Sequence, residues 1–172
     1  MSIRNPFLFY DSGVLGAGVA DVTISSIPAI DGASIRIEAL ARGVRAATTD
    51  NLYMEYNGDT TATNYVWQFV RGFEGAVSAA VYDEQGIASI PAASATAGLY
   101  AGIDILMSQY AGTAHAKTAV STSISNRAFT SARRVLLIGL QWETADAINA
   151  IKLYPPNGNF ASGSRIKLWI EY

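Results

Sequence analysis

Residues 164–172 read Ser-Arg-Ile-Lys-Leu-Trp-Ile-Glu-Tyr and alternate apolar with polar side chains. Successive side chains of a β-strand point to opposite faces, so Ile166, Leu168 and Ile170 would face a core. The residues between them, which include Trp169, would face the other way. This stretch therefore predicts a half-buried strand at the C-terminal end of the sequence.

The same period of two recurs in residues 33–43 and 50–59. Turn residues separate the runs, including Asn-Gly-Asp at 57–59 and Pro-Pro-Asn-Gly at 155–158. Many short strands with no long helix predict an all-β fold, an antiparallel jelly-roll-like sandwich or a barrel. Residues 143–149 are expected to form a helical turn and 91–98 a loop. Further strands are expected at 19–27, 65–73, 76–82, 98–107, 116–124, 135–142 and 148–154.

The N-terminal residues, 1–18, have a different character and are predicted to form an arm beside a sandwich domain of residues 19–172. Phe7, Phe9 and Tyr10 belong to an apolar cluster that precedes a glycine-containing stretch. One interpretation is an edge strand that joins the sheet. The other is an arm that docks on a neighbouring subunit, since exposed aromatic patches mark interaction sites.

The composition limits the partners. Half of the 172 residues are hydrophobic and only 15% are charged, which favours a surface partly covered by other subunits. A net charge of −2 argues against nucleic-acid binding. No stretch approaches the roughly 20 apolar residues of a membrane helix, and no secretory signal is recognisable. We therefore expect a soluble protein made in the cytoplasm, without membrane insertion.

Catalytic patterns are missing from the sequence. His115 is the only histidine, so we expect a surface or structural role for it rather than a place in a triad. Asp83 and Glu84 are adjacent and would point to opposite faces of a strand, which does not suit glycoside hydrolysis. Residues 55–64 are rich in oxygen ligands, but their spacing does not fit a calcium loop and favours an Asx-rich turn. We expect no enzyme activity, metal or cofactor.

Aromatic residues leave a second kind of site open. Tyr65, Trp67 and Trp142 could stack on a saccharide and contact a glycan. Packing in the core or at an interface is the alternative use of such residues, because aromatic side chains dominate burial energetics.

Four segments taken in order resemble a β-sandwich module of tailed-bacteriophage virion proteins. The resemblance covers roughly residues 26–172 and includes the Asn-Gly-Asp turn followed by Asn-Tyr and the Tyr-Ala-Gly turn followed by Lys. The final strand departs from the family pattern at residues 168–172. The segments are IPAIDGASIRIEALARG, TTDNLYMEYNGDTTATNY, IPAASATAGLYAGIDILMSQYAGTAHAKTA and QWETADAINAIKLYPPNGNFASGSRIKLWIEY.

The resemblance implies a jelly-roll-like, surface-exposed virion part of the capsid-decoration or head- or tail-fibre type, with no active site. It implies a homo-oligomer, with a trimer favoured, that contacts other virion proteins and resides on the virion surface. Attachment would use the N-terminal arm. The alternative is a carbohydrate-binding module for host-surface glycans. The residues expected at the anchor or interface are Phe7, Phe9, Tyr10, Trp169 and Tyr172.

The two strands near the C-terminus are expected to form a hairpin across the turn at 155–158. This pairing would join residues 151–154 to 165–171 and place Trp169 beside Lys152 or Tyr154 on the outer face. A neighbouring subunit would then cover Trp169 and Tyr172.

Overall fold

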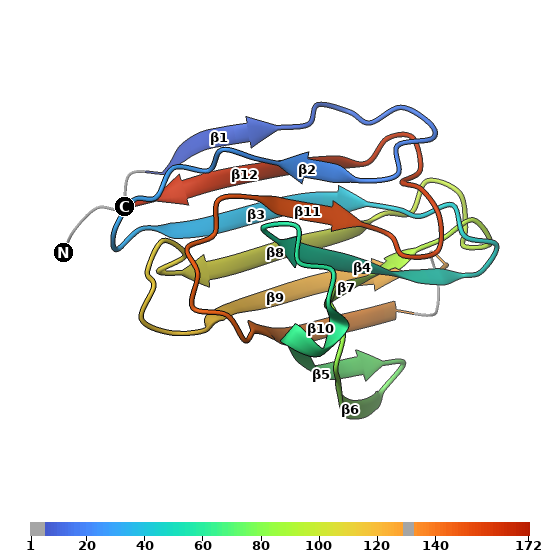
Figure 1. Ribbon diagram of the computed structural model, residues 1–172. Coiled ribbons are helices and arrows are strands. Elements are labelled where there is room, and N and C mark those ends of the chain that lie inside the picture. The colour runs from blue at the N-terminus through green and yellow to red at the C-terminus, as the bar shows by residue number, and fades with distance from the viewer. Residues whose placement is uncertain (1–5, 129–132) are drawn as a thin grey trace.

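The computed structural model describes residues 6–128 and 133–172, which form two antiparallel β-sheets packed face to face (Figure 1). The predicted all-β sandwich is confirmed. The described helical structure is one 3-10 turn, η1 (Ala62–Asn64), and no described helix has the length and apolar character to span a membrane. The strands are β1 (Phe7–Asp11), β2 (Val22–Ile24), β3 (Ser34–Ala41), β4 (Thr49–Tyr56), β5 (Tyr65–Phe73), β6 (Ala76–Tyr82), β7 (Gly86–Pro91), β8 (Ala101–Ser108), β9 (Lys117–Asn126), β10 (Arg133–Trp142), β11 (Ile151–Tyr154) and β12 (Arg165–Glu171).

The sheet topology is that of an extended jelly roll. The larger sheet has the order β1-β12-β3-β8-β9-β10-β5-β6 and the smaller sheet the order β2-β11-β4-β7. When β1, β8, β9 and β12 are set aside, the remaining strands form two four-stranded sheets, β3-β10-β5-β6 and β2-β11-β4-β7, as in a jelly roll, a sandwich of two Greek keys. The β8–β9 hairpin is inserted between β3 and β10, and β12 and β1 extend the larger sheet beyond β3.

The core lies between the sheets and is built from alternate residues of the strands. In β12, Ile166, Leu168 and Ile170 are completely buried, as the alternation of this stretch predicts. Full burial of an aliphatic side chain of this size stabilises the fold by roughly 1.5–3 kcal/mol. The intervening residues of β12, Trp169 among them, lie on the outer face of the larger sheet and are half-buried.

The expected C-terminal hairpin is wrong. Strand β11 pairs with β2 and β4 in the smaller sheet, whereas β12 pairs with β1 and β3 in the larger one. The connection from 155 to 164 crosses from one sheet to the other, and Phe160 is buried within it. Trp169 consequently lies opposite Arg36 and Leu8 rather than beside β11. Both strands alternate correctly, but alternation does not identify a strand's partner.

Two local expectations also differ from the structure. Residues 143–150 contain no helical turn. Their amides are held instead by other segments: the N–H of Ile148 donates to the carbonyl of Tyr110, and Asn57 Oδ1 accepts from the N–H groups of Asn149 and Ala150. Strand β7 was not expected, because all six of its residues are buried and it shows no alternation.

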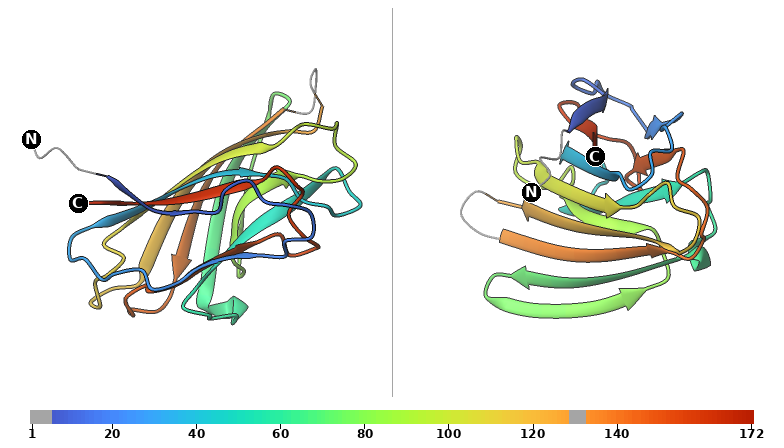
Figure 2. Two further views of the ribbon diagram at one scale, coloured as in Figure 1. Left: turned by 90° about the horizontal axis from the view of Figure 1, so that it is seen from above. Right: turned by 90° about the vertical axis from the view of Figure 1, so that its left-hand side faces the viewer.

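The N-terminal residues 7–11 form an edge strand. Strand β1 pairs antiparallel with β12, with Phe7 opposite Ile170 and a break in register between Leu8 and Tyr10. The opposite edge of the larger sheet is β6, which lies far from β1 (Figure 2). Phe9 and Tyr10 pack partly against the core. The interpretation of this cluster as an edge strand thus describes its place in the fold; docking on another subunit stays a prediction.

Candidate interaction surface

The outer face of the larger sheet is exposed to solvent across neighbouring strands. The strand registers align its outward side chains in three rows that run from β12 to β6. The first row contains Arg165, Leu40, Gly102, Ile124, Val135, Gly72 and Val77. The second contains Lys167, Glu38, Asp104, Thr122, Leu137, Val70 and Ala79. The third contains Trp169, Arg36, Leu106, Val120, Gly139, Gln68 and Val81.

The half of this face formed by β12, β3 and β8 is charged. Arg36 Nε donates to Asp104 Oδ1 at 2.8 Å, and Arg36 Nη2 lies 3.6 Å from Glu38 Oε1. Arg165 is hydrogen-bonded to Asp11 of β1 and lowers the pKa of that carboxyl to about 2. These charges are paired within the chain, and exposed pairs of this kind contribute little to stability.

The half formed by β9, β10, β5 and β6 is aliphatic. The residues that these strands contribute to the three rows carry no charge and include no aromatic ring. Contiguous apolar patches of this kind mark interaction sites on soluble proteins. We call this half the aliphatic face. Its large side chains, each between 47% and 78% exposed, are Val70, Val77, Val81, Val120, Ile124, Val135 and Leu137.

Glycines leave depressions in the outer face of the larger sheet. A Cβ added at Gly72, Gly102 or Gly139 would have no atom within 4 Å, so each of these residues leaves open space between larger neighbours. A groove of about 800 Å³ runs over the boundary between the charged half and the aliphatic face. Its lining includes Glu38, Leu40, Asp104, Ile124, Val135 and Leu137.

Strand β6 is an unprotected edge beside the aliphatic face. Its seven residues, Ala76–Tyr82, include no charge and no proline, the usual devices that keep an edge from pairing with another chain. The other edges differ: β1 is irregular and ends in Asp11, β2 has three residues, and β7 is buried. A two-residue turn precedes β6, with Glu74 and Gly75 at φ 47° and 85°, as a type I′ hairpin requires.

The predicted anchor residues gather at the corner where β1 meets β12. The ring centroid of Phe7 lies 6.5 Å from that of Phe9 and 5.9 Å from that of Tyr172, which is 59% exposed. Tyr10 lies opposite Leu168. Trp169 belongs to the other side of the sheet, in the outer face beside Arg36. The structure therefore brings four of the five residues to one side of this corner.

The residues expected to contact a glycan are core residues. Tyr65, Trp67 and Trp142 are exposed by 0%, 6% and 2%. Tyr65 and Trp142 stack with ring centroids 6.4 Å apart, and Trp67 stacks on Tyr82. A sugar ring cannot reach these aromatic faces, so the predicted platform is corrected: the three side chains fill the space between the sheets.

A polar aromatic cluster that the sequence did not reveal lies on the smaller sheet. The Tyr154 hydroxyl donates to Glu55 Oε1 at 2.5 Å, and the Tyr53 hydroxyl donates to Glu84. The tyrosine rings meet edge to face at 5.8 Å, and Lys152 Nζ lies 3.5 Å from Glu55 Oε2. Burial and the neighbouring carboxylates raise the pKa of both tyrosines. The pairing of β4 with β11 places Tyr53 opposite Tyr154 and Glu55 opposite Lys152, and the sequence gives no sign of this pairing.

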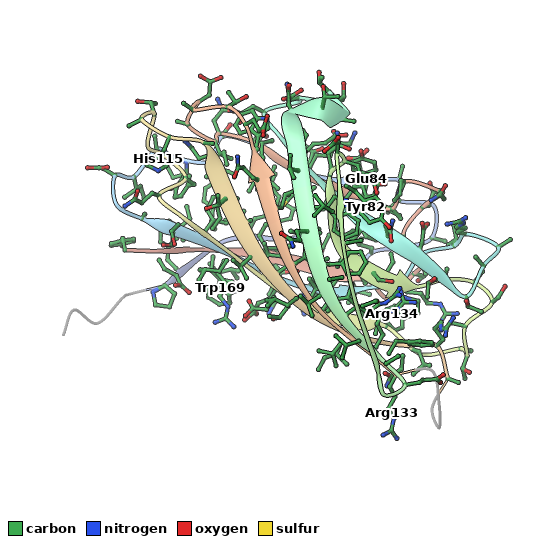
Figure 3. The ribbon with its side chains drawn as sticks, turned by 90° about the horizontal axis from the view of Figure 1, so that it is seen from below. Tyr82, Glu84, His115, Arg133, Arg134 and Trp169 are labelled. Atoms are coloured by element: carbon green, nitrogen blue, oxygen red, sulfur yellow. The ribbon has the colours of Figure 1, made fainter. Side chains whose placement is uncertain are left out.

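Metal-binding clusters are not found among residues 6–128 and 133–172. His115 is exposed in the loop between β8 and β9 (Figure 3). No group of three or more His, Cys, Asp or Glu side chains within these ranges could hold a metal ion.

Comparison with known proteins gives no family. No family model and no curated protein matches this chain. Among solved structures, the chain has a weak similarity to the C-terminal CBM6 of LamC, a marine laminarinase from Zobellia galactanivorans. That match has 13% sequence identity and covers 87% of this chain and 99% of the other, with a TM-score of 0.17. A likeness this weak supports no inference about fold or function.

Proposed function

We propose that this protein is a non-enzymatic structural protein of a bacteriophage particle that associates with copies of itself at the virion surface. The aliphatic face is the observation that carries this proposal. Seven large aliphatic side chains on neighbouring strands are each at least 47% exposed. Only 15% of the residues of this chain are charged. Such a surface is stabilised by burial against another protein surface.

A second copy of the chain is the occupant that we propose for this face. The unprotected edge of β6 borders it, so an associating chain can cover apolar side chains and unpaired backbone groups together. The face also lacks the aromatic rings with which proteins stack on sugars. The resemblance of the ordered sequence segments to phage virion modules, together with the jelly-roll topology, supports a trimeric capsid decoration or a fibre-associated protein.

The solution mass of the full-length protein tests self-association. Light scattering over a range of concentrations should give a homo-oligomer, which Leu137→Lys should dissociate by placing a charge in the aliphatic face. Val14→Lys is the matched control, because Val14 is a 71% exposed aliphatic residue in the loop after β1. A monomeric parent protein, or an oligomer that survives Leu137→Lys, would contradict this part of the proposal.

Attachment to the particle is proposed to use the aromatic corner formed by Phe7, Phe9, Tyr10 and Tyr172. Removing residues 1–17 is a poor test, since it would also uncover the edge of β12. Phe7→Ser with Tyr172→Ser changes the exposed rings and keeps the strand. Mass spectrometry of purified particles should detect the parent protein and show at least a several-fold loss of the double variant. Equal incorporation of the two would overturn the anchor.

The alternative function, glycan recognition, is favoured by one observation. Tyr53 and Tyr154 are partly exposed on the smaller sheet beside carboxylates and an amine, groups that can bond to sugar hydroxyls. A glycan array with the parent protein and Tyr154→Ala tests it. Binding that Tyr154→Ala abolishes would support this function, and an array without hits would remove it.

A further inference from the structure

Three arginines converge at one end of the sandwich, away from the aliphatic face. Arg71 lies in β5, Arg134 in β10, and Arg127 directly follows β9. The guanidinium carbons of Arg127 and Arg134 lie 4.4 and 5.5 Å from the ring centroid of Phe73, and that of Arg71 lies 5.7 Å from the ring of Phe69. Arg127 and Arg134 thus share the ring of Phe73, and Arg71 lies over the next inward-facing ring of the same strand, Phe69.

The position of Arg134 in β10 directs its side chain to the inner side of the larger sheet. Arg133 and Arg134 are neighbours in β10, and their side chains point to opposite sides of the sheet (Figure 3). Arg133 is exposed, whereas Arg134 is partly buried and its Nη1 donates to Ser89 Oγ of β7 at 2.5 Å. Arg134 therefore spans from the larger sheet to the smaller one.

The positive charge of this arginine cluster, Arg71, Arg127 and Arg134, is not balanced by a paired carboxylate in the part of the chain that the structure describes. Arg36, Arg45 and Arg165 each form an ion pair with an aspartate. None of the ion pairs found among the described residues involves a member of the cluster. Burial, and next the charges of Arg71 and Arg127, lower the pKa of Arg134 to about 10. Like charges are thus crowded where water is partly excluded.

The cluster is also rich in donors and poor in acceptors. The Nε atoms of Arg127 and Arg134 are buried and have no hydrogen-bond partner within the described structure. The same holds for the hydroxyls of Ser123 and Ser125, which are exposed by 2% and 1%. Ser125 lies directly opposite Arg134 in the β9–β10 ladder. Leaving buried donors unpaired destabilises the fold, so an acceptor at this place would stabilise it.

We infer that Arg71, Arg127 and Arg134 form a binding site for an oxyanion group: a sulfate, a phosphate or a carboxylate. Such a group has only acceptor oxygens and a negative charge, which complement the unpaired donors and the crowded positive charges. Guanidinium groups bind these planar or tetrahedral anions through two parallel hydrogen bonds, and stacking on Phe73 holds two of the guanidinium groups in place. The site is separate from the surfaces that the proposed function uses.

Thermal unfolding of the full-length protein in different anions tests the site. About 10 mM sulfate should raise the midpoint by roughly 3 °C above chloride of equal ionic strength if the dissociation constant is near 1 mM. Glucuronate and inorganic phosphate in parallel distinguish a carboxylate from a tetrahedral anion. Isothermal titration calorimetry with the anion that gives the largest shift should show saturable binding.

Matched variants decide whether the arginine cluster is responsible. Arg134→Gln and Arg71→Gln should each reduce the anion-dependent shift at least threefold. Arg133→Gln removes the same charge from the neighbouring position of β10 and should keep the whole shift. Circular dichroism checks that each variant is folded. If Arg134→Gln does not fold, Arg71→Gln alone provides the test. The inference is overturned if no anion acts beyond ionic strength, or if Arg133→Gln loses as much of the shift as the two cluster variants.

Discussion

The indole Nε1 of Trp142 donates a hydrogen bond of 2.7 Å to Oδ2 of Asp59 and so ties the end of β10 to the turn after β4. Asp59 Oδ1 also accepts from the N–H of Thr61, and Oδ2 accepts from Asn64 Nδ2. The prediction of an Asx-rich turn in residues 55–64 is confirmed. The Asp59 carboxylate accepts hydrogen bonds from the backbone of the turn and from an aromatic core residue.

Asp59→Asn should destabilise the protein at neutral pH and have little effect at strongly acidic pH. Burial raises the pKa of Asp59, but the hydrogen bonds from Trp142, Asn64 and Thr61 outweigh it and lower the pKa from 3.8 to about 2. The ionised carboxylate therefore stabilises the fold above pH 3.8, and this contribution disappears as the pH falls toward 2. We expect the variant to lose about 1–2 kcal/mol of unfolding free energy at neutral pH, allowing for solvent screening.

Urea unfolding followed by tryptophan fluorescence, at neutral pH and at several acidic values, measures this effect. The difference between the parent protein and Asp59→Asn should shrink as the pH falls through the range from 3.8 to about 2. Asp31→Asn, at an exposed position, is the control and should show no such convergence. A difference that is independent of pH would mean that the carboxylate's charge is not what stabilises the turn.

Arg42→Lys should loosen the loop between β7 and β8. The Arg42 guanidinium is buried and donates to the carbonyls of Thr96, Leu99 and Ala95 at 2.8 to 3.0 Å, with a longer bond to Ala93. A lysine ammonium is a single point with three donors and cannot span these acceptors. We expect a loss of about 2–3 kcal/mol and faster cleavage of residues 92–99 by a protease. Limited proteolysis with mass spectrometry locates the cuts.

Arg45→Lys is the control for this loop, since the Arg45 side chain is half-exposed and forms an ion pair with Asp50. The protease should cut the Arg45→Lys variant at the same rate as the parent protein. If Arg42→Lys resists protease as well as Arg45→Lys does, the carbonyl contacts do not order the loop.

The sequence predicts the strands and their faces well because burial on one side imposes a period of two. Ile166, Leu168 and Ile170 are buried as the alternation requires. Strand β7 escapes this signal because it is covered on both faces, so its residues, from Gly86 to Pro91, show no alternation. Strand partners escape it too: β11 and β12 have equivalent patterns and lie in different sheets.

The candidate sites were harder to predict than the fold. An aromatic residue in a strand can fill a core or bind a sugar, and only the three-dimensional structure shows that Trp67 and Trp142 do the former. The aliphatic face arises from two pairs of consecutive strands, β5–β6 and β9–β10, which are distant in sequence and become neighbours through the topology. The arginine cluster likewise depends on register, which places Arg134 opposite Phe73 and Ser125.

Gly86, the first residue of β7, is buried against the indole of Trp67. A Cβ at this position would lie 2.7 Å from Trp67 Cε2 and 3.0 Å from Cδ2. The indole has little room to retreat, because its ring lies 5.2 Å from those of both Tyr82 and Phe69. The φ of Gly86 is not in the left-handed region, so an alanine meets only the steric conflict. Gly86→Ala should therefore cost about 1–3 kcal/mol, as overpacking does.

Chemical denaturation of a double-mutant cycle checks this cause. Trp67→Phe removes the atoms that the new methyl group meets, so Gly86→Ala should cost at least about 1 kcal/mol less in the Trp67→Phe background than alone. Gly72→Ala is the control: it is also a strand glycine, but its added Cβ meets no atom within 4 Å on the outer face. It should leave stability unchanged or raise it, since alanine restricts the unfolded chain. Equal losses from Gly86→Ala and Gly72→Ala, or no coupling to Trp67→Phe, would show that close packing against the indole is not why position 86 requires glycine.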